Sequence, residues 1–165
     1  MTIFYNPAYI SKPYTDSDRG AVFAADYCGD IQLLQRLLFY AGIPYLPVTR
    51  EQRIAHYHTN MLSKMTASSP FYGSFKTDSA GMSRAVLTWR DALVGVGWNV
   101  SAYEGSSVKL SLIRDFEPED MPRGEADYWK ILIGKAEECR VLPEGINIVV
   151  TCRQSEIKPR IAHIL

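Results

Sequence analysis

Glu156 and Lys158 form the most suggestive pair of chemical groups in this sequence. Their spacing matches the second half of the PD-(D/E)xK pattern, in which acids hold a divalent metal ion and the lysine stabilises charge on the attacked phosphate. That chemistry needs the acid and the lysine on a strand. Here they follow the apolar run 145–152, and Pro159 disfavours a continuing strand. We therefore interpret both residues as solvated surface charges.

A phosphate-binding loop of the form G-x-x-x-x-G-K-[ST] is absent from the sequence. The Gly134-Lys135 pair lies inside a predicted helix and is followed by Ala136, without the companion residues that the loop requires. Asp127 and Lys130 have one residue too many between them for the acid-x-lysine pattern. We therefore expect no ATP hydrolysis and no DNA cleavage by this chain, and we assign no catalytic, cofactor-binding or metal-binding residue in it.

Histidines and cysteines show no spacing that suits a metal site or an activated nucleophile. His56 and His58 lie two apart on a predicted helix and so point about 200° apart, whereas a shared metal site needs an i, i+4 pair. Cys28, Cys139 and Cys152 are odd in number and form no C-x-x-C pair, which argues against a disulfide framework or a zinc knuckle. This usage favours the reducing cytoplasm.

The composition is that of a folded protein without a strong electrostatic preference. The chain has 165 residues, 47% of them hydrophobic and 22% charged, which suits one domain, 1–165. Its 18 basic and 18 acidic residues cancel, so it lacks the positive field of a self-sufficient nucleic-acid binder. We expect weak non-specific DNA binding at most. No signal peptide and no apolar run of roughly 20 residues is present, so we expect no membrane association.

The elements that must position these groups are mostly helices, with strands near both ends. Thr49 and Gln52 have the spacing of a capping box at a helix start, and Asp78 is placed to cap another helix. The apolar run 145–152 is typical of a buried strand in a parallel sheet covered by helices, so the expected fold class is α/β. The predicted helices are 30–42, 49–66, 78–97, 107–115, 124–138 and 156–165; the predicted strands are 2–5 and 145–152; Ile10 to Gly29 has the pattern of a long loop or broken helix; and 71–75 has that of an aromatic loop.

The helix after Asp78 has an apolar face that includes Trp89. Helical periodicity places Trp89 in line with Met82, Ala85, Val86, Leu93 and Val96. Its ring is therefore expected in the core, where truncation would cost about 3 to 5 kcal/mol. Arg90 and Asp91 are then expected to be an exposed charge pair.

The segment from Pro70 to Trp98 resembles one protein family. Its residues Pro70-Phe71-Tyr72-Gly73-Ser74-Phe75, Asp78, Gly81, Arg84, Leu87, Thr88-Trp89-Arg90-Asp91-Ala92-Leu93 and Gly97-Trp98 follow the pattern "PFY..SF..D..G.A..LL.WRD.L...GW". This pattern is similar to that of the AddB-like, RecB-type exonucleases, where it lies in the N-terminal, helicase-like region. The resemblance is looser over 30–165.

The resemblance implies a helix-rich piece of a RecA-like, P-loop NTPase-like parallel-sheet domain that lacks the phosphate loop. It implies a non-catalytic N-terminal scaffold of a DNA helicase-exonuclease in double-strand break repair and recombination. The parent protein would contact DNA, pair with a helicase subunit and carry a Mg²⁺-dependent PD-(D/E)xK nuclease domain beyond Leu165. The uncapped apolar end Ile164-Leu165 also favours a longer protein. Two alternatives stay open: a free-standing metal-dependent nuclease that uses Glu156 and Lys158, and a protein-interaction module.

Overall fold

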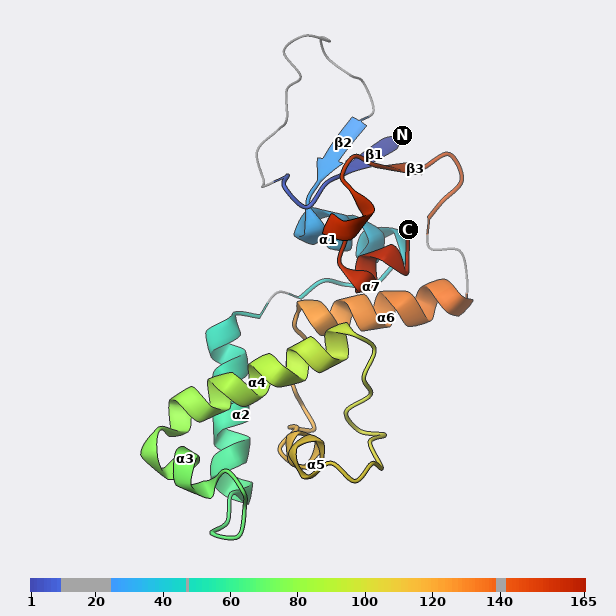
Figure 1. Ribbon diagram of the computed structural model, residues 1–165. Helices are drawn as coiled ribbons and strands as arrows, with labels where there is room; N and C mark the ends of the chain where they lie inside the picture. The colour runs from blue at the N-terminus through green and yellow to red at the C-terminus, as the bar shows by residue number, and fades with distance from the viewer. Residues whose placement is uncertain (10–24, 47, 139–141) are drawn as a thin grey trace. The chain divides into compact units, whose positions relative to one another are not determined.

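The structure is a mixed α/β arrangement with a small parallel sheet (Figure 1). This computed structural model describes residues 1–9, 25–46, 48–138 and 142–165. Within them the elements are β1 (Thr2–Tyr5), β2 (Ala25–Cys28), α1 (Asp30–Tyr40), α2 (Arg50–Lys64), α3 (Tyr72–Thr77), α4 (Ser79–Gly95), α5 (Val108–Asp115), α6 (Glu125–Glu138), β3 (Asn147–Val150), a 3₁₀ turn (Gln154–Glu156) and α7 (Pro159–Ala162). The α/β class expected from the sequence is therefore confirmed.

The chain divides into two compact units. The sheet unit consists of Met1–Tyr45 together with Tyr128–Leu165, and the helical unit consists of Leu46–Asp127. The chain thus leaves the sheet unit after α1 and returns to it within α6. Cys28, Cys152 and the acid and lysine pair belong to the sheet unit, whereas the segment Pro70 to Trp98 belongs to the helical unit.

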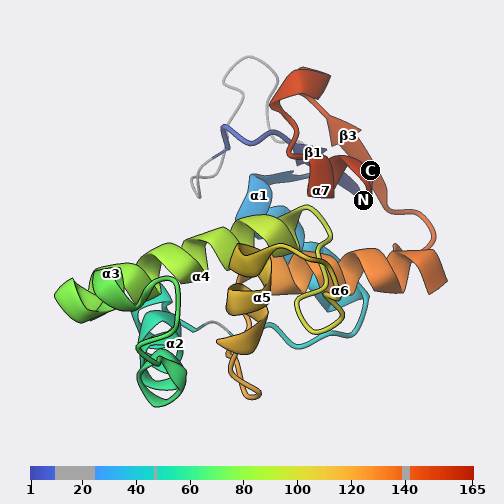
Figure 2. The ribbon, with the colours of Figure 1, turned by 60° about the horizontal axis from the view of Figure 1, so that its bottom comes forward.

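The sheet unit is built on three parallel strands in the order β2-β1-β3. Ile3 and Tyr5 point to one face of the central strand β1 and are fully buried there. Figures 1 and 2 show α1 and α7 on this side of the sheet. Helix α1 buries leucines at i, i+1, i+4 and i+5, which gives it one continuous apolar stripe: Leu33, Leu34, Leu37 and Leu38.

Strand β3 differs from the expectation of a buried strand. It pairs with β1 on one side and, within the described residues, ends the sheet on the other. Val149 and Val150 are 40% and 38% exposed, while Ile148 packs against the core. A continuous apolar run predicts burial of both faces of a strand. On β3, an edge strand of the described sheet, the neighbouring elements cover only part of these side chains. The prediction of burial was therefore wrong for β3.

Hydrophobic periodicity also missed one short element, strand β2, and placed the start of another, helix α7, too early. Strand β2 lies inside the region predicted as a loop or broken helix, whose residues 10–24 are outside the described part. The predicted C-terminal helix begins only at Pro159, after a separate 3₁₀ turn, because proline fits the first helical position, where its missing N–H costs nothing.

In the helical unit, α2 packs across α4 (Figure 2). The capping box at the start of α2 is confirmed: the Thr49 hydroxyl accepts the Gln52 N–H at 3.2 Å, and the Gln52 side chain accepts the Thr49 N–H at 3.0 Å. The core of this unit combines side chains of α2, α3, α4, α5 and the segment after α5: Tyr57, Met61, Phe75, Met82, Val86, Leu87, Ile113 and Phe116.

Helix α4 buries a different face from the one predicted. Trp89 is 45% exposed, and Arg90 beside it is only 5% exposed. The buried positions are Met82, Ser83, Val86, Leu87, Arg90 and Val94. The helix is therefore rotated about its axis relative to the expectation. Arg90, with its carboxylate partners, is buried where hydrophobic periodicity predicted Trp89. The aromatic segment before it was also misread: residues from Tyr72 onward form the short helix α3.

Candidate functional site

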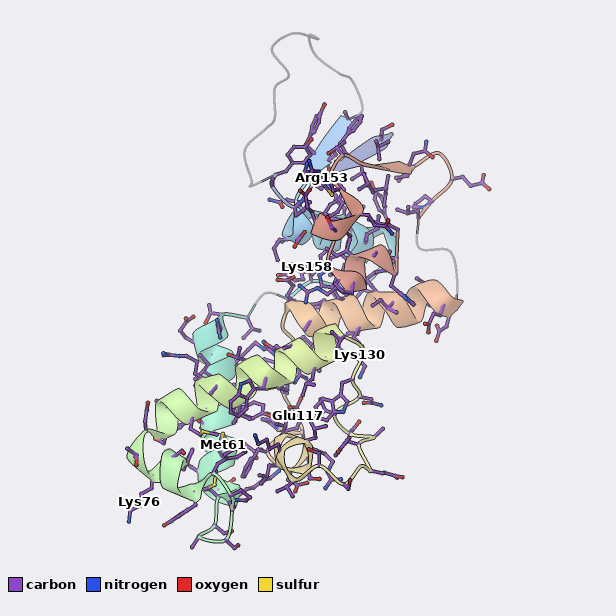
Figure 3. All side chains as sticks on the ribbon, in the orientation of Figure 1. Met61, Lys76, Glu117, Lys130, Arg153 and Lys158 are labelled. Atoms are coloured by element: carbon purple, nitrogen blue, oxygen red, sulfur yellow. The ribbon has the colours of Figure 1, made fainter. Side chains whose placement is uncertain are left out.

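A group of charged side chains built around two buried arginines lies in the helical unit, and we call it the arginine cluster. It consists of Arg53 on α2, Arg90 and Asp91 on α4, Glu117 after α5, and Asp127 in the first turn of α6. Both arginines are about nine-tenths or more buried. Figure 3 labels Glu117, which lies in the interior of this unit near α5. Residues from three helices and one connecting segment thus converge on two guanidinium groups.

Arg90 is at the centre of the cluster. Its Nη2 donates to Glu117 Oε1 at 2.6 Å, and its Nη1 lies 2.6 Å from Asp127 Oδ1 and 3.1 Å from Asp91 Oδ1. Burial alone would lower the pKa of Arg90, but the hydrogen bond to Glu117 and the charge of Asp127 outweigh it and raise the pKa. The guanidinium therefore stays charged at every pH at which the protein folds.

Arg53 connects the cluster to the backbone. Its Nη2 donates to Asp91 Oδ1 at 2.8 Å, and its Nε donates to the carbonyl oxygen of Pro122 at 2.9 Å. A Cβ atom at Gly124 would lie 2.2 Å from Arg53 Nη1, so only glycine leaves room for this side chain. The segment 116–124, which we call the connector, is thereby fixed to α2.

The cluster is suited to holding structure rather than to performing chemistry. Two guanidinium groups face three carboxylates, and these carboxylates accept several donated hydrogen bonds. The Tyr57 hydroxyl adds a bond to Glu117 at 3.1 Å, and its pKa is raised by burial and then by the Glu117 charge. A proton relay needs a group that titrates near neutral pH, and arginine does not.

One pattern in the sequence indicates this cluster, although a search for apolar periodicity alone does not find it. Arg53, Tyr57 and Met61 follow one another at i, i+4 and i+8, so the arginine continues a buried stripe. An arginine in line with an apolar stripe indicates a buried charge that needs carboxylate partners. Which carboxylates serve it depends on packing between distant segments.

The second polar arrangement lies in the sheet unit, at the carboxyl ends of the parallel strands. After β1, the Asn6 amide lies 3.4 Å from the Thr151 carbonyl oxygen, which follows β3, and Tyr9 Oη lies 3.2 Å from Thr151 Oγ1. At the start of α1, Asp30 accepts the Tyr5 hydroxyl at 2.8 Å. Ligands of open α/β sheets bind at this edge, where the strand order reverses.

The acid and lysine pair also lies at this edge, but its two members serve different partners (Figure 3 labels Lys158). Glu156 Oε2 accepts the backbone N–H of Arg153 at 3.1 Å. Lys158 Nζ lies 2.7 Å from Asp30 Oδ2, so the lysine is paired across the fold rather than only solvated. Among the described residues, no three His, Cys, Asp or Glu side chains gather closely enough to hold a metal ion.

The remaining candidates are scattered. His56 is exposed, His58 Nε2 lies 3.1 Å from Ser79 Oγ, and His163 Nε2 lies 3.5 Å from Glu137. Gly134 and Lys135 lie inside α6, as predicted. Cys139 falls outside the described residues. Asp127 belongs to the arginine cluster.

An open polar groove of about 690 Å³ runs between α2 and the connector. Two polar side chains on its α2 wall bond the chain at the end of α5: Asn60 to the Phe116 carbonyl and Lys64 Nζ to the Asp115 carbonyl at 2.9 Å. The groove therefore reflects how the connector is attached.

Cys28 gives a test of the sheet unit's packing. It is buried at the end of β2, and burial, followed by the Asp26 charge, raises the pKa of its thiol to about 11. The folded state holds this proton more tightly than the unfolded state, so Cys28 lowers stability as pH rises from about 9 to about 11. We expect peptide mapping to find Cys28 unmodified by iodoacetamide at pH 8 in native protein and alkylated in urea. Alkylation of Cys28 at equal rates in both states would contradict this packing.

The residues that carry the family resemblance have structural positions in the helical unit. Asp78 Oδ1 accepts the Gly81 N–H at 2.8 Å and caps α4, as predicted. A Cβ atom at Gly81 would lie 2.0 Å from the Asp78 carboxylate, so a larger residue there would push the capping carboxylate aside. Phe75 is buried, and Arg90 is at the centre of the arginine cluster.

The fold and the site together define a mixed α/β protein with a small parallel sheet. No protein family model matches this chain, and no curated protein and no solved structure matches it either. In the described part of the chain, none of the helices is long and apolar enough to cross a bilayer.

Proposed function

We propose that this chain is the non-catalytic, N-terminal, helicase-like scaffold region of a DNA helicase-exonuclease that acts in double-strand break repair and recombination. In this proposal the parent protein carries a Mg²⁺-dependent nuclease domain beyond Leu165, works in the cytoplasm with a helicase partner subunit and contacts DNA. The chain itself holds no cofactor.

The proposal is supported by the structural roles of the residues in the resembling segment. Asp78 caps α4, Gly81 makes room for that cap, and Arg90 organises the arginine cluster. Each of these contacts builds the helical unit, and none presents a reactive group to a substrate. A motif of this kind is expected in a region that supports chemistry performed elsewhere.

A RecA-like plan for the sheet unit is the finer part of the proposal. Three features support it: the strands are parallel, β1 is central, and a helix follows β2 and another follows β3. The helical unit, Leu46–Asp127, interrupts the sheet unit between α1 and the later part of α6. An inserted helical unit of this kind suits a scaffold, because it adds a surface without disturbing the strand order.

The first prediction is that the purified chain neither hydrolyses ATP nor degrades linear DNA with Mg²⁺ or Mn²⁺. The physical reason is the missing phosphate loop and the separate partners of Glu156 and Lys158. Phosphate release and gel assays of DNA measure both activities. Metal-dependent degradation that Glu156→Ala abolishes would overturn the proposal.

The reading frame beyond the Leu165 codon provides an independent test. Several hundred further residues with a distal D…(D/E)xK pattern are expected. A stop codon directly after Leu165 would contradict the scaffold proposal and favour a free-standing protein.

A free-standing metal-dependent nuclease is the second candidate, favoured by one contact. Lys158 lies beside Asp30, so an acid and a lysine do meet at the carboxyl edge of the sheet. Asp30→Asn is the variant that separates the two candidates: it would abolish cleavage by a nuclease at this edge, and a scaffold has no cleavage to lose. A protein-interaction module would show neither cleavage nor the distal nuclease pattern.

A further inference from the structure

One row of side chains across the sheet shows where the described sheet is incomplete. Cys28, Tyr5 and Val150 are neighbours on β2, β1 and β3, and they point to the face that α1 and α7 cover. Cys28 and Tyr5 are 1% and 0% exposed, whereas Val150 is 38% exposed. Exposure along this row therefore rises at the outer edge of β3, on a face that is otherwise packed.

The next row, on the opposite face, changes in the same direction. Tyr27 stacks on Phe4 with ring centroids 5.1 Å apart, and both side chains are partly buried. Val149, the third member of this row, is 40% exposed. In a parallel sheet both faces are covered, and valines of an inner strand are buried. Val149 and Val150 therefore have the residue type of an inner strand and the exposure of an edge.

The backbone of β3 has hydrogen-bonding groups on the side away from β1. The N–H groups of Asn147 and Thr151 donate to carbonyl oxygens of the β1 segment at 3.2 and 2.9 Å. The direction of these groups alternates along a strand, so those of Ile148 and Val150 point to the outer edge. No strand in the described part of the chain pairs with that edge. Such an edge is a template for a further strand.

The path of the chain selects this edge for the next strand. Between β2 and β3 the chain crosses the face covered by α1 and passes β1 to its other side. After β3 it returns to the same face in α7, whose Ile161 is fully buried in the same core. Crossovers between parallel strands are right-handed in about 98% of cases, so two successive crossovers over one face move in one direction. The strand after α7 is thus expected beside β3, on the side away from β1.

The chain reaches the position at which such a strand would begin. Residues 151–165 supply the roughly dozen residues that a crossover to a parallel strand needs. In Figures 1 and 2 the C-terminus lies on the same side of the sheet as the N-terminus, where the parallel strands begin. Connections from a helix to the next strand are about 2 to 6 residues long, so we expect the strand to start within a few residues of Leu165.

We infer that the free edge of β3 binds a parallel β-strand that the parent polypeptide supplies directly after Leu165. This strand pairs with the outward N–H and C=O groups of Ile148 and Val150 and covers the exposed sides of Val149 and Val150. Its sequence is expected to be a short run of apolar and β-branched residues. The inference rests on the proposed function, which supplies the longer chain, and it names the surface through which the rest of the parent protein joins this region.

A second copy of this chain fits the edge less well. β3 has four residues, and two-fold pairing of identical edges would join only these short segments. A strand from the same polypeptide also avoids the translational and rotational free-energy cost of association. The second copy is therefore an outcome that the experiment must distinguish.

The first measurement compares hydrogen exchange at single residues in the 165-residue chain and in the longer product of the reading frame. The amides of Ile148 and Val150 should exchange about tenfold or more slowly in the longer protein, because each gains a hydrogen bond there. The Val149 amide is the internal control. Its N–H points to β1, so its exchange should be slow in both proteins.

The second measurement uses two proline variants in both proteins. Val150→Pro removes an outward N–H, which an edge strand tolerates, so it should shift the urea midpoint of the 165-residue chain little and that of the longer protein clearly more. Val149→Pro is the matched control. It removes an N–H that points to β1 and should lower the midpoint of both proteins. Exchange of α1 peptides reports the unfolding of the sheet unit.

Equal exchange of Ile148 and Val150 in the two proteins would overturn the inference, and so would equal midpoint shifts from Val150→Pro. If these amides are already protected in the 165-residue chain, and Val150→Pro converts a dimer of that chain into a monomer, the edge belongs to a second copy and the inference is wrong. A longer frame with the distal nuclease pattern but an unprotected β3 edge would leave the proposed function standing. Protected amides in a longer protein without that pattern would contradict the proposed function alone.

Discussion

Replacing Arg90 with methionine is expected to lower the free energy of unfolding of the helical unit by about 3 to 5 kcal/mol. The change keeps the aliphatic stem but removes the charge that faces Glu117, Asp127 and Asp91. These carboxylates would remain partly buried, with Arg53 as the remaining cation of the cluster. Unpaired buried charge is among the few causes of such large effects from one substitution.

The matched control is Arg36→Met in the sheet unit. Arg36 Nε lies 2.6 Å from Asp26, the same distance as in the Arg90 pair with Glu117, but its side chain is half exposed. Water already solvates that pair, so we expect a loss of no more than about 1 kcal/mol. Equal losses in the two variants would show that burial does not control the strength of the arginine cluster.

Two compact units need not unfold as one, so the measurement must report on each. Urea unfolding combined with hydrogen exchange of peptides from α2, α4 and α6 separates them. Arg90→Met should shift the α2 and α4 peptides to lower urea. A shift confined to peptides of the sheet unit would contradict the assigned role of Arg90.

The second large effect is expected from Trp129→Ala in α6, which should lower the stability of the sheet unit by about 3 to 5 kcal/mol. Trp129 is 1% exposed and packs with the leucines of α1. Truncation removes the transfer free energy of the ring and leaves a cavity beneath the sheet. Trp129 Nε1 is buried without a hydrogen-bond partner in the described structure, so Trp129→Phe should cost less than the alanine change.

Trp89→Ala is the control for this prediction, since it deletes the same ring from an exposed site. It should cost no more than about 1 kcal/mol, mostly the contact with Phe71. Urea midpoints of the two alanine variants decide the matter. If Trp89→Ala were the more damaging change, the buried face of α4 would be the one that hydrophobic periodicity predicts.

Local signals predicted the starts of α2 and α4 well. The Thr49 and Gln52 capping box and the Asp78 cap form within one turn of chain, so the residues that make them are visible in the sequence. The start of α1 was only partly predicted. Asp30 is its first residue, but its carboxylate binds Tyr5 and Lys158 instead of capping the helix.

Long-range contacts account for the errors. Trp89 was predicted to be buried because hydrophobicity favours a ring over a charge, and Arg90 is buried instead because Glu117 and Asp127 surround it. The apolar run of β3 does not reveal that the strand lies at an edge of the described sheet.

The sequence by itself determined the α/β class, the helix caps, the absence of a phosphate loop and the poor support for a catalytic site. These properties depend on residue type and on spacing within a few residues. Tertiary structure alone decided that Arg53 and Arg90 share carboxylates, that Lys158 meets Asp30 and that Trp89 faces solvent. The physical reason is that a charged side chain can be buried only where groups of opposite charge lie beside it. Here those groups belong to segments far apart in the chain.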